Sequence, residues 1–329
     1  MIERNCITSI SISGRITLDM HSLNNEGNEG NQVLTRQATI IDQNGNPATV
    51  TAVSGDMMKH ISTEHFWKIA KEESLSLSET SKSFNSNRIV TNDLIKGNIT
   101  KDDLKKQSVA MDEVVKTCSL SDVAGAMITD VGNFARKSVM EYGWLVALPE
   151  ANETENYFHV KFVSDAKAKK DEKTEETSKS NEGQNIFHRP ANSGIYAFVG
   201  NLEISRLGYN DISKKYPIND EERTKRFKAL LKSVLYTFIK PNGAMRNTQN
   251  PHILNFEGVV AYSHSSCPAP TISGLKDGYK EEIEKIAQNL NKIQKQTIET
   301  KTFDSLSEFT DIFSVLIDSN PGKINDNNN

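Results

Sequence analysis

The stretch ITSISISGRITL, residues 7–18, decides the expected fold. Along it, isoleucine or leucine stands at positions 10, 12, 16 and 18, and polar residues stand between most of them. This period of two is typical of a β-strand with one buried face. We therefore expect residues 7–18 to form a strand that opens the fold and packs one face against a core.

The segments that follow predict a loop and then a hairpin. Residues 19–31 are rich in Asn, Gly and Ser, which favour exposed backbone over regular structure, so they are expected to form a loop. Residues 35–41 are a second candidate strand. The dipeptide Asn44-Gly45 is a strong two-residue hairpin signal before residues 48–53.

A helix is predicted to follow this hairpin. Ser54-Gly55-Asp56 supplies a helix cap, and apolar side chains then recur at helical spacing from Met58 to Ile69. Residues 71–106 are polar and irregular, which indicates an insertion with short helical pieces. Residues 142–148 resemble a central strand that ends at Pro149.

A long β-arm is expected in the middle of the chain. Residues 165–185 contain five lysines and six acidic residues and no hydrophobic residue larger than alanine, so the segment gains too little from burial to order itself. Strand-like residues 157–163 and 195–204 flank it. We expect an arm whose tip, residues 165–185, is flexible.

The C-terminal part is predicted to be mainly helical. Apolar residues at 227, 230, 231, 234, 235 and 238 indicate a packing helix that ends near Pro241. Two further helices are expected, one over residues 283–293 and one that begins at the capping pair Ser305 and Glu308. The Asn-rich tail after Pro321 is expected to be disordered.

The charge balance restricts any nucleic-acid surface to a local one. The 329 residues include 43 acidic and 39 basic side chains, for a net charge of −4. A chain of this kind can bind phosphates only where its cations converge.

No apolar run approaches the roughly 18 residues of a membrane span, and no signal-peptide pattern opens the sequence. Three scattered cysteines fit a reducing compartment. We expect a cytoplasmic location and no membrane partner.

Two groups of residues are candidates for phosphate contact. Gly14-Arg15 and Arg36, beside the Asn- and Gly-rich loop, could follow a phosphate backbone, although an exposed arginine on an ordinary strand explains them as well. Ser54-Gly55, with Lys59 and His60, places polar groups at a helix start, where free N–H groups attract anions. An ordinary capped helix has the same pattern.

The candidates for chemistry are weak. His252, His264 and Cys267 lack a standard spacing for metal ligands, so neither a metal nor another cofactor is expected. No elbow or triad signature supports a nucleophile. Asp19, His21 and Glu26 could serve in phosphodiester cleavage, but loop polarity accounts for them.

The order of several short motifs resembles a known family. ISGRIT (12–17), HSLNNEG (21–27) and VSGDMMKH (53–60) resemble the N-terminal half of the backbone subunit of the type I CRISPR surveillance complex (Cascade), subtypes I-A and I-B. DVAG (122–125), RKS (136–138) with LP (148–149), and GAMR (243–246) agree with it. The resemblance spans about residues 7 to 260.

The resemblance implies an α+β fold of defined parts. Its core is an RRM-like, ferredoxin-type antiparallel-sheet palm, expected over residues 1–55, 120–150 and 190–320 together with the C-terminal helices. A helical fingers insertion is expected over residues 56–119. A thumb-type β-arm is expected over residues 151–192, and a disordered tail over 321–329.

The resemblance also implies the function. The chain would be a non-catalytic crRNA-binding subunit that polymerises with other copies of itself into a helical filament along a guide RNA. It would associate with other Cascade subunits and leave the bases free to pair with target DNA. Relatives of type III cut RNA with a loop aspartate, whereas this loop offers only Glu26 and Glu29. A metal-independent endoribonuclease that processes the guide, and a solitary RNA-binding regulator, remain as alternatives.

Together, the motifs and cations give a set of expected contacts. The residues expected to contact RNA are Gly14, Arg15, His21, Ser22, Asn24, Asn25, Arg36, Ser54, Gly55, Lys59, His60, Arg136, Lys137, Gly243 and Arg246. Subunit contacts are expected from Tyr157, Phe158, Phe187 and Tyr196 of the arm. To offset the net charge, Arg15, Lys59, Arg136 and Arg246 are expected to line one groove.

Overall fold

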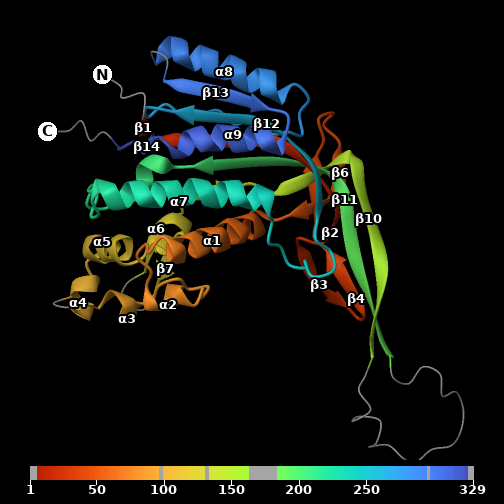
Figure 1. Cartoon of the computed structure of the whole chain (residues 1–329), viewed down its shortest axis with the longest axis horizontal. Helices are drawn as coiled ribbons and strands as arrows, with labels where there is room; N and C mark the ends of the chain where they lie inside the picture. The colour runs from red at the N-terminus through yellow and green to blue at the C-terminus, as the bar shows by residue number, and fades with distance from the viewer. Residues whose placement is uncertain (1–5, 96–98, 130–132, 163–183, 295–296, 325–329) are drawn as a thin grey trace, which may run out of the picture.

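The computed structural model describes residues 6–95, 99–129, 133–162, 184–294 and 297–324. The fold is α+β, and strands pair almost entirely antiparallel in the main sheet (Figure 1). Its order is β13-β12-β2-β11-β10-β6-β5. At its centre, β2 (Ser9–His21) pairs with β12 (His252–Ser263) on one side and β11 (Gln184–Leu202) on the other. The other strands on this path are β13 (Ile298–Phe303), β10 (Leu145–Phe162), β6 (Pro47–Val53) and β5 (Gln37–Ile41).

The alternation along β2 has the expected consequence. Ile10, Ile12 and Ile16 are buried in the main core. On the opposite face, the Ser11 hydroxyl donates to the Pro270 carbonyl oxygen at 2.6 Å. The predicted opening strand is therefore confirmed, and the loop before α8 (Tyr279–Ile293) covers its polar face here.

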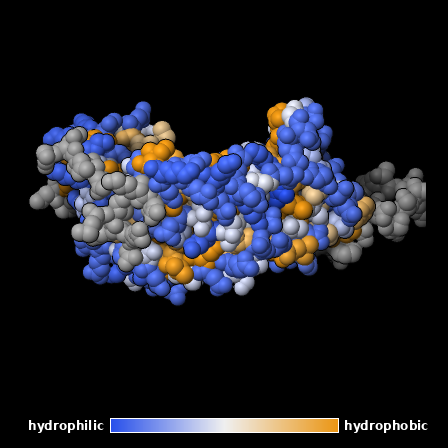
Figure 2. Space-filling view, turned by 90° about the horizontal axis from the view of Figure 1, so that it is seen from above, coloured by the Kyte–Doolittle hydropathy of each residue, from blue (hydrophilic) through white to orange (hydrophobic). Residues whose placement is uncertain are grey.

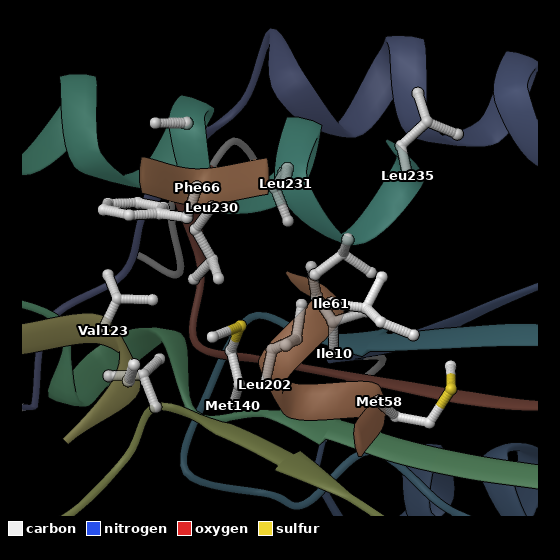
Figure 3. Close-up of a cluster of buried hydrophobic side chains, with 14 of the residues drawn as sticks. Ile10, Met58, Ile61, Phe66, Val123, Met140, Leu202, Leu230, Leu231 and Leu235 are labelled. Carbon is white, nitrogen blue, oxygen red and sulfur yellow. The ribbon is translucent and has the colours of Figure 1, made fainter. Parts of the chain in front are cut away.

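Helices cover the apolar face of the sheet. The helices α1 (Gly55–Glu72), α7 (Asp220–Ile239) and α9 (Leu306–Ile317) contribute to one buried cluster with β2. Figure 3 shows Ile61 of α1 and Leu231 of α7 in this cluster, near Ile10. On the other face of the sheet, Tyr279 and Ile283 of α8 pack against Val259 and Ala261 of β12. Seen from the side of α8, the surface is largely hydrophilic, with separate hydrophobic patches (Figure 2).

The helix starts follow their sequence signals. The Ser54 hydroxyl accepts from the Met57 N–H at 3.2 Å and caps α1. Likewise, the Ser305 hydroxyl caps α9 by accepting from the Glu308 N–H at 3.2 Å. The segment between α1 and the next core strand contains helices α2 to α6. Their bounds are Glu79–Lys82, Thr91–Leu94, Lys101–Leu104, Gln107–Thr117 and Ser119–Ala124.

Two expectations about local structure were wrong. The loop expected over residues 19–31 contains β3 (Asn25–Glu29), which pairs with β4 (Gln32–Thr35) around a turn at Gly30, whose φ is 57°. The strand expected to end at Pro149 continues through it as β10, because the register shifts between Ala147 and Asn152 and so tolerates a residue without an N–H. Of the tail expected to be disordered, the part up to Ile324 is ordered, since the Ile324 N–H donates to the Tyr216 hydroxyl at 2.8 Å; for residues 325–329 the expectation stays a prediction.

The arm is formed by β10 and β11. They pair antiparallel from Thr154 and Asn192 to Phe162 and Gln184, and the ribbon extends away from the helices (Figure 1). The expected flexible tip, residues 165–185, falls almost entirely on residues 163–183, which lie outside the described residues, as do residues 325–329. The boundaries assigned to palm, fingers and thumb stay a prediction.

Candidate nucleic-acid interface

Segments that are far apart in the sequence meet at the end of β2. The Asn24 side-chain oxygen accepts from the Ser54 N–H at 2.8 Å, which joins the loop after β2 to the start of α1. The Ser22 hydroxyl donates to the Asn25 side-chain oxygen at 2.9 Å. These bonds order four of the residues predicted to contact RNA: Ser22, Asn24, Asn25 and Ser54.

The loop around Gly243 joins this cluster from a third segment. The Ala244 N–H donates to the Leu23 carbonyl oxygen at 2.9 Å, and the Met245 N–H donates to the Ser22 carbonyl oxygen at 3.1 Å. A Cβ on Gly243 would lie 2.7 Å from the Leu23 Cα, so the contact requires glycine. The motifs around residues 21–25, 54–55 and 243–246 therefore form one site.

A hollow of about 820 Å³ lies beside this site. His60, Gly243 and Arg246, which were predicted to contact RNA, line it. The side chains with formal charge on its wall are Lys68, Arg189, Lys240, Arg246 and Glu64. Four cations against one carboxylate give a local positive charge in a chain whose net charge is −4. We call this surface the basic hollow.

A second hollow of about 550 Å³ lies at the first turn of α1. Gly55, Lys59 and Lys137 line it, together with Asp56 and Glu141. The Lys137 ammonium pairs with the Glu141 carboxylate at 2.7 Å. Burial lowers the pKa of Lys59, and the nearby Arg88 guanidinium lowers it further. Its two lysines are matched by two carboxylates, so this hollow lacks the excess positive charge of the basic hollow. Trp144 also lines it, so we call it the Trp144 hollow.

His21 is not a surface residue, contrary to the prediction. Its side chain is buried, and its ring lies edge-on to the Tyr196 ring with centroids 5.1 Å apart. Its Nδ1 accepts from the Leu23 N–H at 3.4 Å. Burial lowers the pKa of His21 to about 4, against the opposing effect of the Asp19 carboxylate. The neutral ring therefore supports the loop from beneath and does not contact a ligand at the surface.

This burial predicts a pH dependence of stability. The unfolded chain takes up a proton at His21 near pH 6.5 and the folded chain only near pH 4. Between these values the unfolded state binds more protons, so this residue should reduce the free energy of unfolding by up to about 3 kcal/mol as the pH falls. Urea unfolding at a series of pH values measures this slope. His21→Gln should flatten it in the same window; an unchanged slope would contradict the assignment.

Gly14 and Arg15 also have internal roles. A Cβ on Gly14 would lie 2.6 Å from the Glu257 carbonyl oxygen of β12, so strand packing explains this glycine. The Arg15 guanidinium donates from Nε to the Gly274 carbonyl oxygen at 2.6 Å and pairs with Asp277 at 2.8 Å. This geometry does not support their prediction as phosphate contacts, because Gly14 is required by strand packing and the Arg15 guanidinium is bonded to the loop before α8.

Arg136 is buried in an ion-pair cluster. Its Nη2 lies 2.7 Å from the Asp122 carboxylate, and the side chain has no exposed surface. The expectation that Arg15, Lys59, Arg136 and Arg246 line one groove is therefore wrong. Lys59 and Arg246 line the two hollows, whereas Arg15 and Arg136 are bonded within the protein.

Arg36 remains at the surface, beside the aromatic ring of Trp144, which lies between β9 and β10. Its Nη1 lies 3.3 Å from the Glu26 carboxylate, and its guanidinium carbon lies 5.7 Å from the centre of the Trp144 ring. Lys68, Arg189 and Lys240 of the basic hollow were not among the predicted RNA contacts. They come from separate segments, and no spacing in the sequence links them.

Of the residues predicted for subunit contact, one is buried and the others are at least partly exposed. Tyr196 is fully buried, and its hydroxyl lies 2.9 Å from the Thr51 hydroxyl, so it is not available to a neighbour. Phe158 is 65% exposed, while Tyr157 and Phe187 are half-buried. Val160 and Ile186 are additional exposed apolar residues of the arm.

Two general features of the described residues can be added. No helix among them is long and apolar enough to cross a membrane. Within the same ranges, no group of three or more His, Cys, Asp or Glu side chains is arranged to hold a metal ion.

Comparison with known proteins assigns the family. Residues 12–284 match the model of the family described as "CRISPR-associated negative auto-regulator DevR/Csa2". The chain is 25% identical to the CRISPR-associated protein Cas7/Cst2/DevR of Methanocaldococcus jannaschii, over 86% of this chain and 90% of that protein. It is 22% identical to the CRISPR-associated protein Cas7/Csa2 1 of Saccharolobus solfataricus, over 80% of this chain and 82% of that protein.

Solved structures similar to this one include chains of two CRISPR RNA-guided surveillance complexes. The first, described as pre-nicking, has a TM-score of 0.48 and 12% identity, covering 94% of this chain and 100% of that chain. The second has a TM-score of 0.42 and 10% identity, covering 89% and 87%. The family model covers most of the chain, including all three motifs that meet at the end of β2, and the chain therefore belongs to the CRISPR-associated DevR/Csa2 family.

Proposed function

We propose that this protein is a crRNA-binding backbone subunit of a type I CRISPR surveillance complex, and that guide RNA lies across the basic hollow. The observation that carries the proposal is the meeting of the segments 21–25, 54–55 and 243–246 beside four cations. Neutral polar groups and cations of this kind bind sugars and phosphates without reading the sequence. The bases would then stay free to pair with target DNA.

The strand order supports a ferredoxin-type palm. Along the chain, β2, α1, β9 (Met140–Tyr142), β11, α7 and β12 follow one another, apart from inserted segments. The strands β12, β2, β11 and β9 are neighbours in that order, and each pair is antiparallel. This is a βαβ-βαβ arrangement with the first strand in the centre. Helices α2 to α6 would then be the fingers, and the β10–β11 ribbon the thumb.

The proposed assembly follows from these parts. Other copies of this chain would bind successive stretches of the guide and form a helical filament, together with other Cascade subunits, in the cytoplasm. We also propose that the protein is not an enzyme. The loop carboxylate of Glu26 pairs with Arg36, and the buried His21 is out of reach of a phosphodiester, so neither is placed to act as a general acid or base.

RNA binding by charge variants tests the proposal. Arg246→Glu in the basic hollow should weaken binding of guide RNA about equally for all spacer sequences, and should reduce the salt slope by about one. Lys225→Glu is the matched control, because Lys225 is exposed near the start of α7 and outside both hollows. Fluorescence anisotropy at several salt concentrations measures both quantities.

Two results would contradict the proposal. Binding that Arg246→Glu leaves unchanged, or weakens for one spacer only, would exclude backbone contact at the basic hollow. Shortened RNA recovered from the same incubations without metal would favour the endoribonuclease alternative.

The words "negative auto-regulator" in the family description favour one other candidate, a solitary RNA-binding regulator. The mass of the protein bound to guide RNA separates the two functions. A backbone subunit should form particles whose mass grows with RNA length, whereas a solitary regulator should keep a small, constant mass.

A further inference from the structure

Trp144 is an exposed aromatic side chain beside a hollow. It lies between β9 and β10, is 42% exposed, and forms part of the wall of the Trp144 hollow. Tryptophan buries more surface than other residues and usually contributes by that burial. An indole left open beside a hollow at the surface is therefore available to a flat ligand.

The other tryptophan shows the contrast. The Trp67 Nε1–H donates to the Ser81 carbonyl oxygen at 2.9 Å. Its ring contacts the Phe84 ring with centroids 5.2 Å apart and packs against the main core. Trp67 has a structural role, whereas the packing of Trp144 leaves much of its ring open.

The surroundings of Trp144 fit a nucleotide. The Arg36 guanidinium lies over the ring, 5.7 Å from its centre, and Lys59 and Lys137 lie on the wall of the same hollow. The volume of about 550 Å³ is within the range of about 300–1,000 Å³ that small ligands occupy. An aromatic ring beside a guanidinium is a common platform for unpaired bases in single-strand binding proteins.

The charges on the wall of the Trp144 hollow favour base stacking over phosphate binding. Lys59 and Lys137 are offset by Asp56 and Glu141 on the same wall. This wall therefore offers little net attraction to phosphate, unlike the basic hollow. The favourable contact that it can add is the stacking of a base.

We propose that Trp144 is a stacking platform for one unpaired base of the bound RNA, with Arg36 beside it as a second planar group. The inference rests on the proposed function. It adds a residue that contacts the RNA and the requirement that the bound base is unpaired. The ring would take any base, because every base has a π-face. A base held here would be withdrawn from pairing with a target strand.

The test combines affinity, salt dependence and fluorescence. Trp144→Ala should weaken binding of a single-stranded oligoadenylate by about 5- to 150-fold, with an unchanged salt slope, since no cation is lost. Trp144→Phe should restore most of the affinity. In Trp67→Phe, Trp144 is the sole tryptophan, and its fluorescence should be quenched by the single strand and much less by the same strand paired with its complement.

The outcomes separate this inference from the proposed function. If the wild-type protein binds no RNA, the proposed function fails and the inference with it. If the wild-type protein binds RNA but Trp144→Ala binds equally well and Trp144 is not quenched, only the inference is overturned. Equal quenching by the duplex would also overturn it, because paired bases have no free face. Thermal unfolding of each variant should match the wild type, so that lost binding cannot come from lost fold.

Discussion

Asp122→Asn should lower the free energy of unfolding by about 3–5 kcal/mol. The Asp122 carboxylate has no exposed surface and binds two buried arginines, with 2.7 Å to Arg136 Nη2 and 2.9 Å to Arg226 Nη1. It also accepts from the Gly208 N–H at 3.0 Å. Removal of this charge leaves two guanidinium groups in the interior without their common counter-ion.

The position of the cluster explains why the effect should be global. The Arg136 guanidinium donates to the carbonyl oxygens of Tyr209 and Arg206, each at 2.6 Å. The Arg226 guanidinium on α7 donates to the Val115 carbonyl oxygen of α5 at 2.7 Å. Asp122 therefore holds α6, β8 (Phe134–Arg136), the 206–209 loop and α7 together.

Urea unfolding, followed by circular dichroism, measures the loss. Asp102→Asn is the matched control, because Asp102 is 84% exposed in its pair with Lys105 and should contribute less than about 1 kcal/mol. Equal unfolding midpoints for Asp122→Asn and the wild type would show that the cluster does not stabilise the fold.

The same cluster marks the limit of the sequence analysis. The segments 122–125 and 136–138 were correctly singled out, but Arg136 was assigned to RNA. A buried arginine and an arginine on a phosphate-binding surface are the same letter, and only the path of the surrounding chain distinguishes them. The net charge of −4 made convergence of Arg136 with Lys59 plausible, whereas burial beside Asp122 removes Arg136 from the surface.

Local structure was more predictable than the site. Periodicity alone located β2 and α7, because each buries one face, and Ser54 located the start of α1. The β3–β4 hairpin was missed because it has no buried face to impose alternation. The basic hollow was missed in part because Lys68, Arg189 and Lys240 are brought together only by tertiary contacts.

The exposed face of the arm should be required for assembly on the guide. Phe158 pairs with His188, and Val160 pairs with Ile186, so these four residues lie on one face of the β10–β11 ribbon. Phe158 is 65%, Val160 45% and Ile186 37% exposed. At His188, β4 adds a third strand to the ribbon. Beyond it, Val160 and Ile186 lie where only β10 and β11 are paired. A two-stranded ribbon with such a face in water is marginally stable alone, and a neighbouring copy of the chain could cover it.

Replacement of Phe158, Val160 and Ile186 by serine should therefore leave the protein folded but abolish regular assembly. Burial of each such side chain contributes about 1.5–3 kcal/mol. Loss of all three should therefore weaken the contact between neighbouring copies enough to prevent stable multimers. These substitutions do not change the pairing of β2 with β12 in the main sheet. Mass photometry on guide RNA should show single copies or irregular mixtures in place of uniform particles. Ile293→Ser with Val315→Ser is the control, since both residues are exposed on α8 and α9, away from the arm (Figure 1). Uniform particles of wild-type mass from the arm variant would show that subunits meet elsewhere.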